Sequence, residues 1–216
     1  MNATCNNCNE HGLSFFSTHI QPHEYIEGKR NAEIWIIGLN PKDSIGKVEE
    51  RTHLEFEKFN PNCHPYFRDF KNVSEKLYEN WTSDDSKVAH TDLVKCFSPS
   101  FPPTLTGNSK ERNFKVKQII QNCTSHLKLQ LQQNKPKVVI CNGSEVCWQM
   151  LNIFPHNTTQ NTHEITSYQT SLILPNGTTH KFWIVLSGFI GRIDNRNRRR
   201  LGKEIEQILL SEKISL

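Results

Sequence analysis

The sequence contains no apolar run of the roughly 18 residues that a membrane-spanning helix needs. Its first ten residues are polar and include no apolar stretch of the kind found in secretory signals. We therefore expect a cytoplasmic protein that makes no use of a membrane. A dominant charge of one sign is also missing, because the net charge is only +4, which permits nucleic acid as a partner without requiring it.

No internal repeat is present, and neither of the glycine spacings that cradle a nucleotide phosphate occurs. The second absence removes support for a flavodoxin-like redox protein. The chain of 216 residues has the length of one domain, and its charges of both signs are interspersed. We therefore predict a single domain over residues 1–216, with an N-terminal cysteine arm over residues 1–30.

The seven cysteines are an odd count, which argues against a disulfide framework in a chain without an export signal. Cysteines grouped in pairs in a reducing compartment are more often ligands of a metal or a cluster. Cys5 and Cys8 form such a CxxC pair near the start. Cys141 and Cys147 fall in a predicted strand and a predicted helix, where we interpret them as core residues.

Short apolar strands alternate with segments of helical periodicity along most of the chain. Strands are predicted over 32–38, 88–96, 136–141 and 182–186, and a hairpin around Asn176-Gly177 joins 171–174 to 181–186. Helices are predicted over 67–81, 113–132, 145–151 and 195–211. The alternation indicates an α/β fold, a three-layer α/β/α sandwich with a mainly parallel central sheet. The ligand site of such a sheet lies at the carboxyl ends of its strands.

Two polar segments fall at such strand ends. Residues 38–43 follow the first predicted strand and place Asn40, Lys42 and Asp43 there, although a plain polar turn would have the same composition. The second predicted strand carries Asp92 and ends at Cys96.

The order of four segments carries more information than any one of them. They are Gly38-Leu39-Asn40-Pro41, Pro65-Tyr66-Phe67, the Asp-Leu-Val-Lys-Cys stretch at 92–96, and the Pro-Lys-Val-Val-Ile stretch at 136–140 followed by Gly143. In this order they resemble the uracil-DNA glycosylase superfamily, most closely its iron–sulfur branch. The resemblance extends from Cys5 to the last predicted helix. It implies a monofunctional enzyme that binds DNA and hydrolyses the N-glycosidic bond of uracil or another deaminated base.

The resemblance also implies a 4Fe–4S cluster held by Cys5, Cys8, Cys96 and Cys123, which is the usual set of four thiolates. The segment 97–122 is longer than usual in the family, so the loop over 97–112 would have to bulge outward. Structural zinc is an alternative, bound by Cys5, Cys8 and two further ligands that could include Cys63-His64. Reduced thiols without a metal are the third interpretation.

The same resemblance assigns catalytic roles in the loops. Asn40 matches the position whose side chain positions or activates water, and an amide would orient water rather than deprotonate it. Asp43 is a nearby carboxylate that could assist. Ser187 falls in the place of the family's His-Pro-Ser motif, but the loop here contains no histidine. Catalysis without that donor would be weak, depend on Lys42, or be absent.

Base recognition is implied for Gly38, Lys42, Phe67 and Asp92. Phe67 matches the aromatic residue that stacks on the flipped base, with a core phenylalanine as the alternative. Asp92 lies where many members place an asparagine that pairs with uracil. A carboxylate accepts hydrogen bonds but does not donate them, so an exocyclic amino group would suit it better and the target base stays open.

DNA contact is predicted for the end of the chain. Phe189 and its neighbour Ile190 stand between two glycines and could form an apolar wedge that fills the gap left by the flipped base, or a hydrophobic turn. The basic run that follows could contact phosphates or form a solvated face; it consists of Arg192, Arg196, Arg198, Arg199 and Arg200. We expect a monomer with DNA as its partner. The rival function is a base-sensing DNA-binding module on the same fold that has lost catalysis.

Overall fold

A computed structural model describes residues 5–13, 15, 20–41, 58–98, 100–156 and 165–216, to which all structural statements below refer. One sheet holds six strands in the order β1-β3-β2-β4-β6-β5. The strands are β1 (Glu27–Gly28), β2 (Ile34–Gly38), β3 (Val88–Asp92), β4 (Val138–Asn142), β5 (Ser167–Ile173) and β6 (Thr179–Ser187). The four central strands are parallel, and β1 and β5 run antiparallel at the two edges. The predicted α/β fold with a mainly parallel sheet is confirmed.

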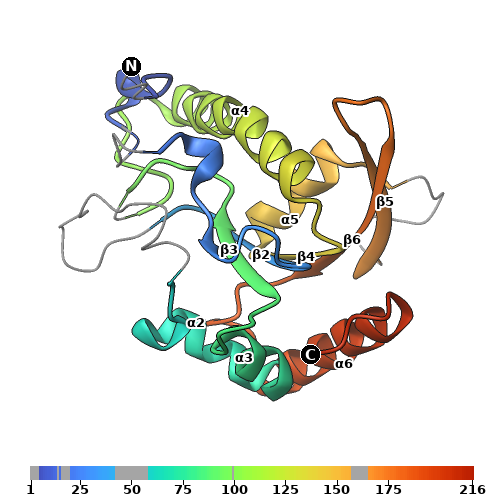
Figure 1. Cartoon of the computed structure of the whole chain (residues 1–216). Helices are drawn as coiled ribbons and strands as arrows, with labels where there is room; N and C mark the ends of the chain where they lie inside the picture. The colour runs from blue at the N-terminus through green and yellow to red at the C-terminus, as the bar shows by residue number, and fades with distance from the viewer. Residues whose placement is uncertain (1–4, 14, 16–19, 42–57, 99, 157–164) are drawn as a thin grey trace.

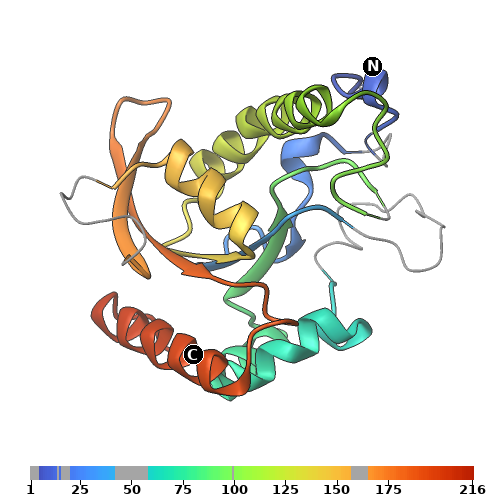
Figure 2. The ribbon, with the colours of Figure 1, turned by 180° about the vertical axis from the view of Figure 1, so that it is seen from behind.

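Helices cover both faces of the sheet (Figures 1 and 2). On one face lie α4 (Ser109–Asn134) and α5 (Ser144–Ile153), and on the other lie α2 (Pro65–Arg68), α3 (Glu75–Trp81) and α6 (Asn195–Ser211). No helix in the described parts of the chain is long and apolar enough to cross a membrane.

The alternation of side chains along β2 shows how the two cores form. Trp35 and Ile37 belong to the core under α4 and α5, whereas Ile34 and Ile36 belong to the core under α3 and α6. All four are completely buried, because β2 lies between two parallel neighbours in a sheet that is covered on both faces. Each face of the sheet therefore contributes to a separate apolar layer.

Two predicted elements differ from the structure. The predicted helix 67–81 is divided into α2, a 3-10 turn over Asp69–Asn72, and α3, because the Ser74 hydroxyl accepts a hydrogen bond from the Leu77 amide and starts a new helix. The predicted strand 88–96 ends at Asp92 instead. Lys95 folds back, and its ammonium donates to the Thr91 hydroxyl at 2.8 Å and to the Asp92 carbonyl.

The ends of the sheet contain one confirmed and one unpredicted element. The hairpin between β5 and β6 turns at Asn176-Gly177, where Gly177 has a φ of +80° that favours glycine. β1 was not predicted, since two residues are too few to show any periodicity. It pairs Glu27 with His90 of β3 and thereby brings a carboxylate to the His90 side chain.

Candidate functional site

The carboxyl ends of the four parallel strands meet at one edge of the sheet, as the fold class predicts. Gly38 at the end of β2 is in register with Asp92 of β3, and Asn142 of β4 is in register with Ser187 of β6. Side chains two residues apart on a strand share a face, so these residues and His90 lie on the face covered by α2, α3 and α6. The predicted residues Gly38, Asp92 and Ser187 are therefore brought to the same end of the sheet.

Gly38 allows three polar side chains to approach the backbone of β2. A Cβ atom on this residue would lie 2.3 Å from Asp92 Oδ1, 3.0 Å from His90 Nε2 and 3.3 Å from the Tyr66 hydroxyl. The first distance is far below van der Waals contact, so any side chain here would displace the carboxylate. Glycine is thus required by close packing, and it marks the point where these groups converge.

A chain of charged groups runs through this point. His90 Nδ1 lies 2.7 Å from Glu27 Oε2, and His90 Nε2 lies 3.9 Å from Asp92 Oδ1. Burial opposes the charged form of His90, but the neighbouring Asp92 and Glu27 carboxylates outweigh it and raise the pKa of His90. Burial is also the main reason that the pKa of Asp92 is raised to about 6. The Tyr25 hydroxyl donates a hydrogen bond of 3.2 Å to Asp92 Oδ2.

Asn142 connects Tyr66 to the loop after β6. Its Nδ2 donates to the Tyr66 hydroxyl at 2.7 Å, and its Oδ1 accepts from the Ile190 amide at 2.8 Å. Burial raises the pKa of Tyr66 well above its ordinary value, so the hydroxyl stays protonated. The nitrogen and the oxygen of the Asn142 amide are therefore both engaged in hydrogen bonds within the protein.

Aromatic rings form the outer wall. Tyr66 stacks on Phe189 with centroids 5.6 Å apart, and Phe189 is 40% exposed with the Arg192 guanidinium 5.9 Å from its ring. Phe67 is half-buried and makes edge contacts with Tyr66 and His90 at 4.7 and 5.0 Å. Phe67 thus lies at the rim of the site but within an aromatic cluster.

The two predicted catalytic residues that are described make local hydrogen bonds. Asn40 is 7% exposed, and its Nδ2 donates to the carbonyls of Pro41 and Ser98 at 3.1 and 2.9 Å. Both amide hydrogens are used, so the Oδ1 is the end that can accept from water. The Ser187 hydroxyl donates to the Gly188 carbonyl at 2.8 Å. Lys42 and Asp43 lie outside the described residues.

The predicted arginines divide into two groups at the start of α6. Arg192, Arg196, Arg199 and Arg200 are exposed. Arg198 is different, since its side chain is 13% exposed and its Nε donates to the Ile190 carbonyl at 3.0 Å. Its guanidinium also lies 3.7 Å from Asp69. Arg198 therefore holds the loop that carries Phe189.

The four cysteines of the N-terminal arm, the β3 loop and α4 are brought together. Cys8, Cys96 and Cys123 are buried, and Cys5 is close enough to influence the pKa values of Cys96 and Cys123. A hydrogen bond from Cys96 is the main cause that lowers the pKa of Cys8 to about 6. The arm is fastened to α4 by Asn122, whose Nδ2 donates to the Asn7 carbonyl at 2.8 Å.

This arrangement bears on which group the cysteines could hold. Among the described side chains, no three His, Cys, Asp or Glu residues are placed to hold a single metal ion. Donors do point at the sulfurs, since the Lys95 amide lies 3.4 Å from Cys123 Sγ and Asn122 Nδ2 lies 3.5 Å from Cys8 Sγ. Such N–H···S contacts are typical around cluster thiolates. The Cys63 side chain lies outside the described part of the structure.

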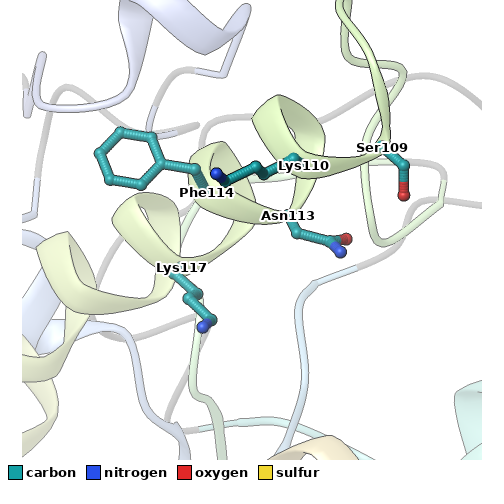
Figure 3. Close-up of a pocket in the computed structure, with 5 residues that line it drawn as sticks. All are labelled: Ser109, Lys110, Asn113, Phe114 and Lys117. Atoms are coloured by element: carbon teal, nitrogen blue, oxygen red, sulfur yellow. The ribbon is translucent and has the colours of Figure 1, made fainter.

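The remaining cysteines and a surface depression lie elsewhere. Cys141 is fully buried in β4, and Cys147 is half-buried on α5, where its sulfur lies 3.2 Å from the Ser187 carbonyl. The depression is on the first turns of α4, and none of the predicted site residues lines it (Figure 3). Its lining residues are Ser109, Lys110, Asn113, Phe114 and Lys117.

Sequence reasoning missed three residues of this site: Glu27, Tyr66 and His90. His90 could have been found, because it stands two residues before Asp92 on a strand and so shares its face. Tyr66 lies in the Pro65-Tyr66-Phe67 segment, in which only Phe67 is predicted to contact the base. Glu27 gave no signal, since only the register of β1 brings it to His90.

Comparison with known proteins agrees with this geometry. A family model described as the uracil DNA glycosylase superfamily matches residues 25–203. The matched region contains all six strands and the site at their carboxyl ends, and it begins after the Cys5–Cys8 pair, so it does not resolve the branch. No curated protein matches the chain significantly. Since the match covers most of its length, the chain belongs to the uracil DNA glycosylase superfamily.

Proposed function

We propose that this protein is a monofunctional DNA glycosylase that hydrolyses the N-glycosidic bond of a deaminated base. The observation that carries the proposal is the convergence of Gly38, His90 and Asp92 at the carboxyl ends of the strands, next to Asn40. A glycosylase must take the base out of the stack and read its edge in a closed pocket. The buried polar atoms around Gly38 are donors and acceptors of the kind that could read such an edge.

The loops at this edge supply the other parts of the reaction. Asn40 would accept a hydrogen bond from water at its Oδ1 and orient that water toward the sugar, since its amide nitrogen is fixed by two carbonyls. Phe189 is exposed on the loop after β6 and would enter the space left by the flipped base. Arg192, Arg196 and Arg199 would neutralise nearby phosphates.

The test is single-turnover release of uracil from a duplex by the purified full chain, with alkali to cleave the abasic strand. We expect release by the wild type and about 100-fold slower release by Asn40→Ala, because oriented water contributes on this scale. A protein that binds the duplex but leaves every strand intact would instead be the base-sensing module. The lack of a histidine in the 187–192 loop is the observation that favours that rival.

We further propose that Cys5, Cys8, Cys96 and Cys123 bind a 4Fe–4S cluster. The grouping of four thiols, three of them buried, and the N–H donors aimed at two sulfurs support a group bound through thiolates, and four thiolates are the usual ligand set of a 4Fe–4S cluster. When bound, the cluster would be an internal staple and would supply no step of the hydrolysis. Through its ligands Cys5, Cys8 and Cys123 it would fix the arm over residues 5–13 against α4.

A cluster is tested by colour and by analysis of iron and sulfide. We expect anaerobically purified protein to absorb at about 400 nm and to hold iron and sulfide in equal amounts. Cys123→Ser should remove both, whereas Cys147→Ser, on α5 away from the arm, should keep them. A colourless protein with stoichiometric zinc would contradict the proposal.

A further inference from the structure

His90 is a buried histidine whose Nδ1 makes a hydrogen bond and whose Nε2 makes none within the described part of the chain. Its side chain is 3% exposed, and Nδ1 is held by Glu27 Oε2 at 2.7 Å. Among the described residues, Nε2 has no hydrogen-bond partner although it is fully removed from solvent. Leaving a buried polar atom unpaired is unfavourable, so a residue kept in this state calls for an explanation.

The direction in which His90 Nε2 points supplies an explanation. Nε2 points to the place beside Gly38 where Asp92 Oδ1 also lies, and the two atoms are 3.9 Å apart. We propose that His90 and Asp92 act as a pair that reads the N–H and C=O edge of the flipped base. The proposal rests on the glycosylase function proposed above, and it assigns the class of base that Asp92 alone left open.

Together the two side chains would supply the acceptor and the donor that the side-chain amide of an asparagine would supply. Asp92 Oδ1 would accept the ring N–H, and His90 Nε2–H would donate to the neighbouring carbonyl oxygen. Uracil, hypoxanthine and xanthine present this edge. Cytosine and adenine present the reverse pattern, a ring acceptor beside an amino donor, and would meet two mismatches. Thymine and guanine share the edge, so other walls of the pocket must exclude them.

Charge around the pair favours the donor form of His90. The groups that face it are Glu27 from β1, Asp92 from its own strand, Tyr66 from α2 and the Lys95 ammonium. The two carboxylates raise its pKa against the opposing effects of burial and the Lys95 ammonium, which favours the form in which both ring nitrogens carry a proton and Nε2 can donate. A cation at the carbonyl would also stabilise the negative charge that the base acquires as it leaves. This would replace the histidine missing from the 187–192 loop.

Two substitutions separate reading from structure. The amide of His90→Asn reaches the Nδ1 position and keeps a donor for Glu27, whereas that of His90→Gln reaches the Nε2 position. We expect His90→Asn to slow release of uracil and hypoxanthine about 100-fold, as loss of one oriented donor does. His90→Gln should stay within about tenfold of the wild type. Equal losses in both variants, with unchanged thermal unfolding, would overturn the proposal.

Repeating His90→Asn in a protein that already carries Asp92→Asn makes the test independent of folding. Asp92→Asn supplies both an acceptor and a donor, so the donor of His90 becomes redundant. The cost of His90→Asn should therefore shrink from about 100-fold to a few-fold in the Asp92→Asn protein, a coupling that a structural role would not produce. An equal cost in both backgrounds would contradict the pair while leaving the glycosylase function intact.

A binding measurement covers the case in which no base is released. Duplexes that carry 2′-fluoro-deoxyuridine or 2′-fluoro-deoxycytidine resist hydrolysis, and we expect the wild type to bind the first more tightly. Loss of that preference in His90→Asn would support the pair even if the protein is only a sensor. No preference in the wild type would overturn it.

Discussion

At the scale of single residues, the arrangement of the site requires that residue 38 has no side chain. In Gly38→Ala, the new Cβ would lie 2.3 Å from Asp92 Oδ1 and would push the carboxylate out of place. We expect base release to fall about 100-fold, because misplacement of a binding group by about 1 Å has an effect of this size. Overpacking should also lower the free energy of unfolding by about 1–3 kcal/mol.

The two effects of Gly38→Ala are measured separately, by single-turnover kinetics and by urea unfolding. Base release at the wild-type rate would show that Asp92 does not need its present position. That result would remove Gly38 and Asp92 from the site.

Asp92 also makes a prediction about pH. Burial is the main cause that raises its pKa from 3.8 to about 6, so between these values the folded chain binds more protons than the unfolded chain. Stability contributed by this group must therefore fall as the pH rises through that range. Asp92→Asn removes the titration. We expect the variant to gain stability relative to the wild type on going from about pH 4 to about pH 7.

Thermal unfolding of both proteins at the two pH values measures this difference. His90→Gln keeps the Asp92 carboxylate and removes a neighbouring charge that lowers its pKa, so the fall in stability with rising pH should persist in that variant. A stability difference between Asp92→Asn and the wild type that does not change with pH would mean that Asp92 titrates normally.

The site residues illustrate how far sequence reasoning reaches. Motif order led to Gly38, Asn40 and Asp92, since each follows or ends a strand and strand ends can be read from composition. Strand alternation could have placed His90 beside Asp92, but Glu27 could not be found, because only the register of β1 and β3 brings it to His90. Asp92 and Glu27 both raise the pKa of His90, and the register that supplies Glu27 is encoded by no local pattern.

At the scale of elements, α6 packs closely against the 3-10 turn over Asp69–Asn72 and the residue that follows it. A Cβ on Gly202 would lie 1.8 Å from the Val73 carbonyl oxygen, which is backbone and cannot rotate away. Alanine ordinarily stabilises a helix by about 1 kcal/mol over glycine. Here the clash decides the sign, and we expect Gly202→Ala to lower the free energy of unfolding by about 1–3 kcal/mol.

Urea denaturation tests this packing. Gln207→Ala serves as the control, because Gln207 is exposed on the same helix and its loss should change stability by no more than about 0.5 kcal/mol. A Gly202→Ala protein as stable as the wild type or more so would mean that α6 can move away from Val73 at little cost.

The elements that sequence reasoning predicted well are those with strong periodicity. β2, β4 and α6 match within a few residues, because apolar runs and helical spacing directly reflect burial. The break between α2 and α3 was missed, since the apolar spacing of Phe67, Phe70 and Leu77 continues across it. There a single hydroxyl, that of Ser74, determines where the helix restarts.

At the scale of the whole molecule, positive charge is concentrated beside the loop proposed to enter DNA. Arg192→Ala, Arg196→Ala and Arg199→Ala should each weaken binding to a duplex. Each should also reduce the slope of log affinity against log salt by about one, as expected for a phosphate contact. Fluorescence anisotropy at several salt concentrations measures both quantities.

Lys181→Ala is the matched control, since Lys181 is exposed near the amino end of β6, away from the loop. It should leave the slope unchanged. Arg198→Ala should act differently from its neighbours: by releasing the Ile190 carbonyl it would slow base release more than it changes the salt slope. Equal slopes for the wild type and all three exposed variants would show that the basic run is a solvated face.

The most direct test of the account compares four otherwise identical duplexes that carry uracil, hypoxanthine, xanthine or cytosine. Each is incubated with an excess of the full chain and then treated with alkali. The account predicts strand cleavage at one or more of the three deaminated bases and none at cytosine. Intact strands at all four positions, from a protein that binds the same duplexes, would contradict it.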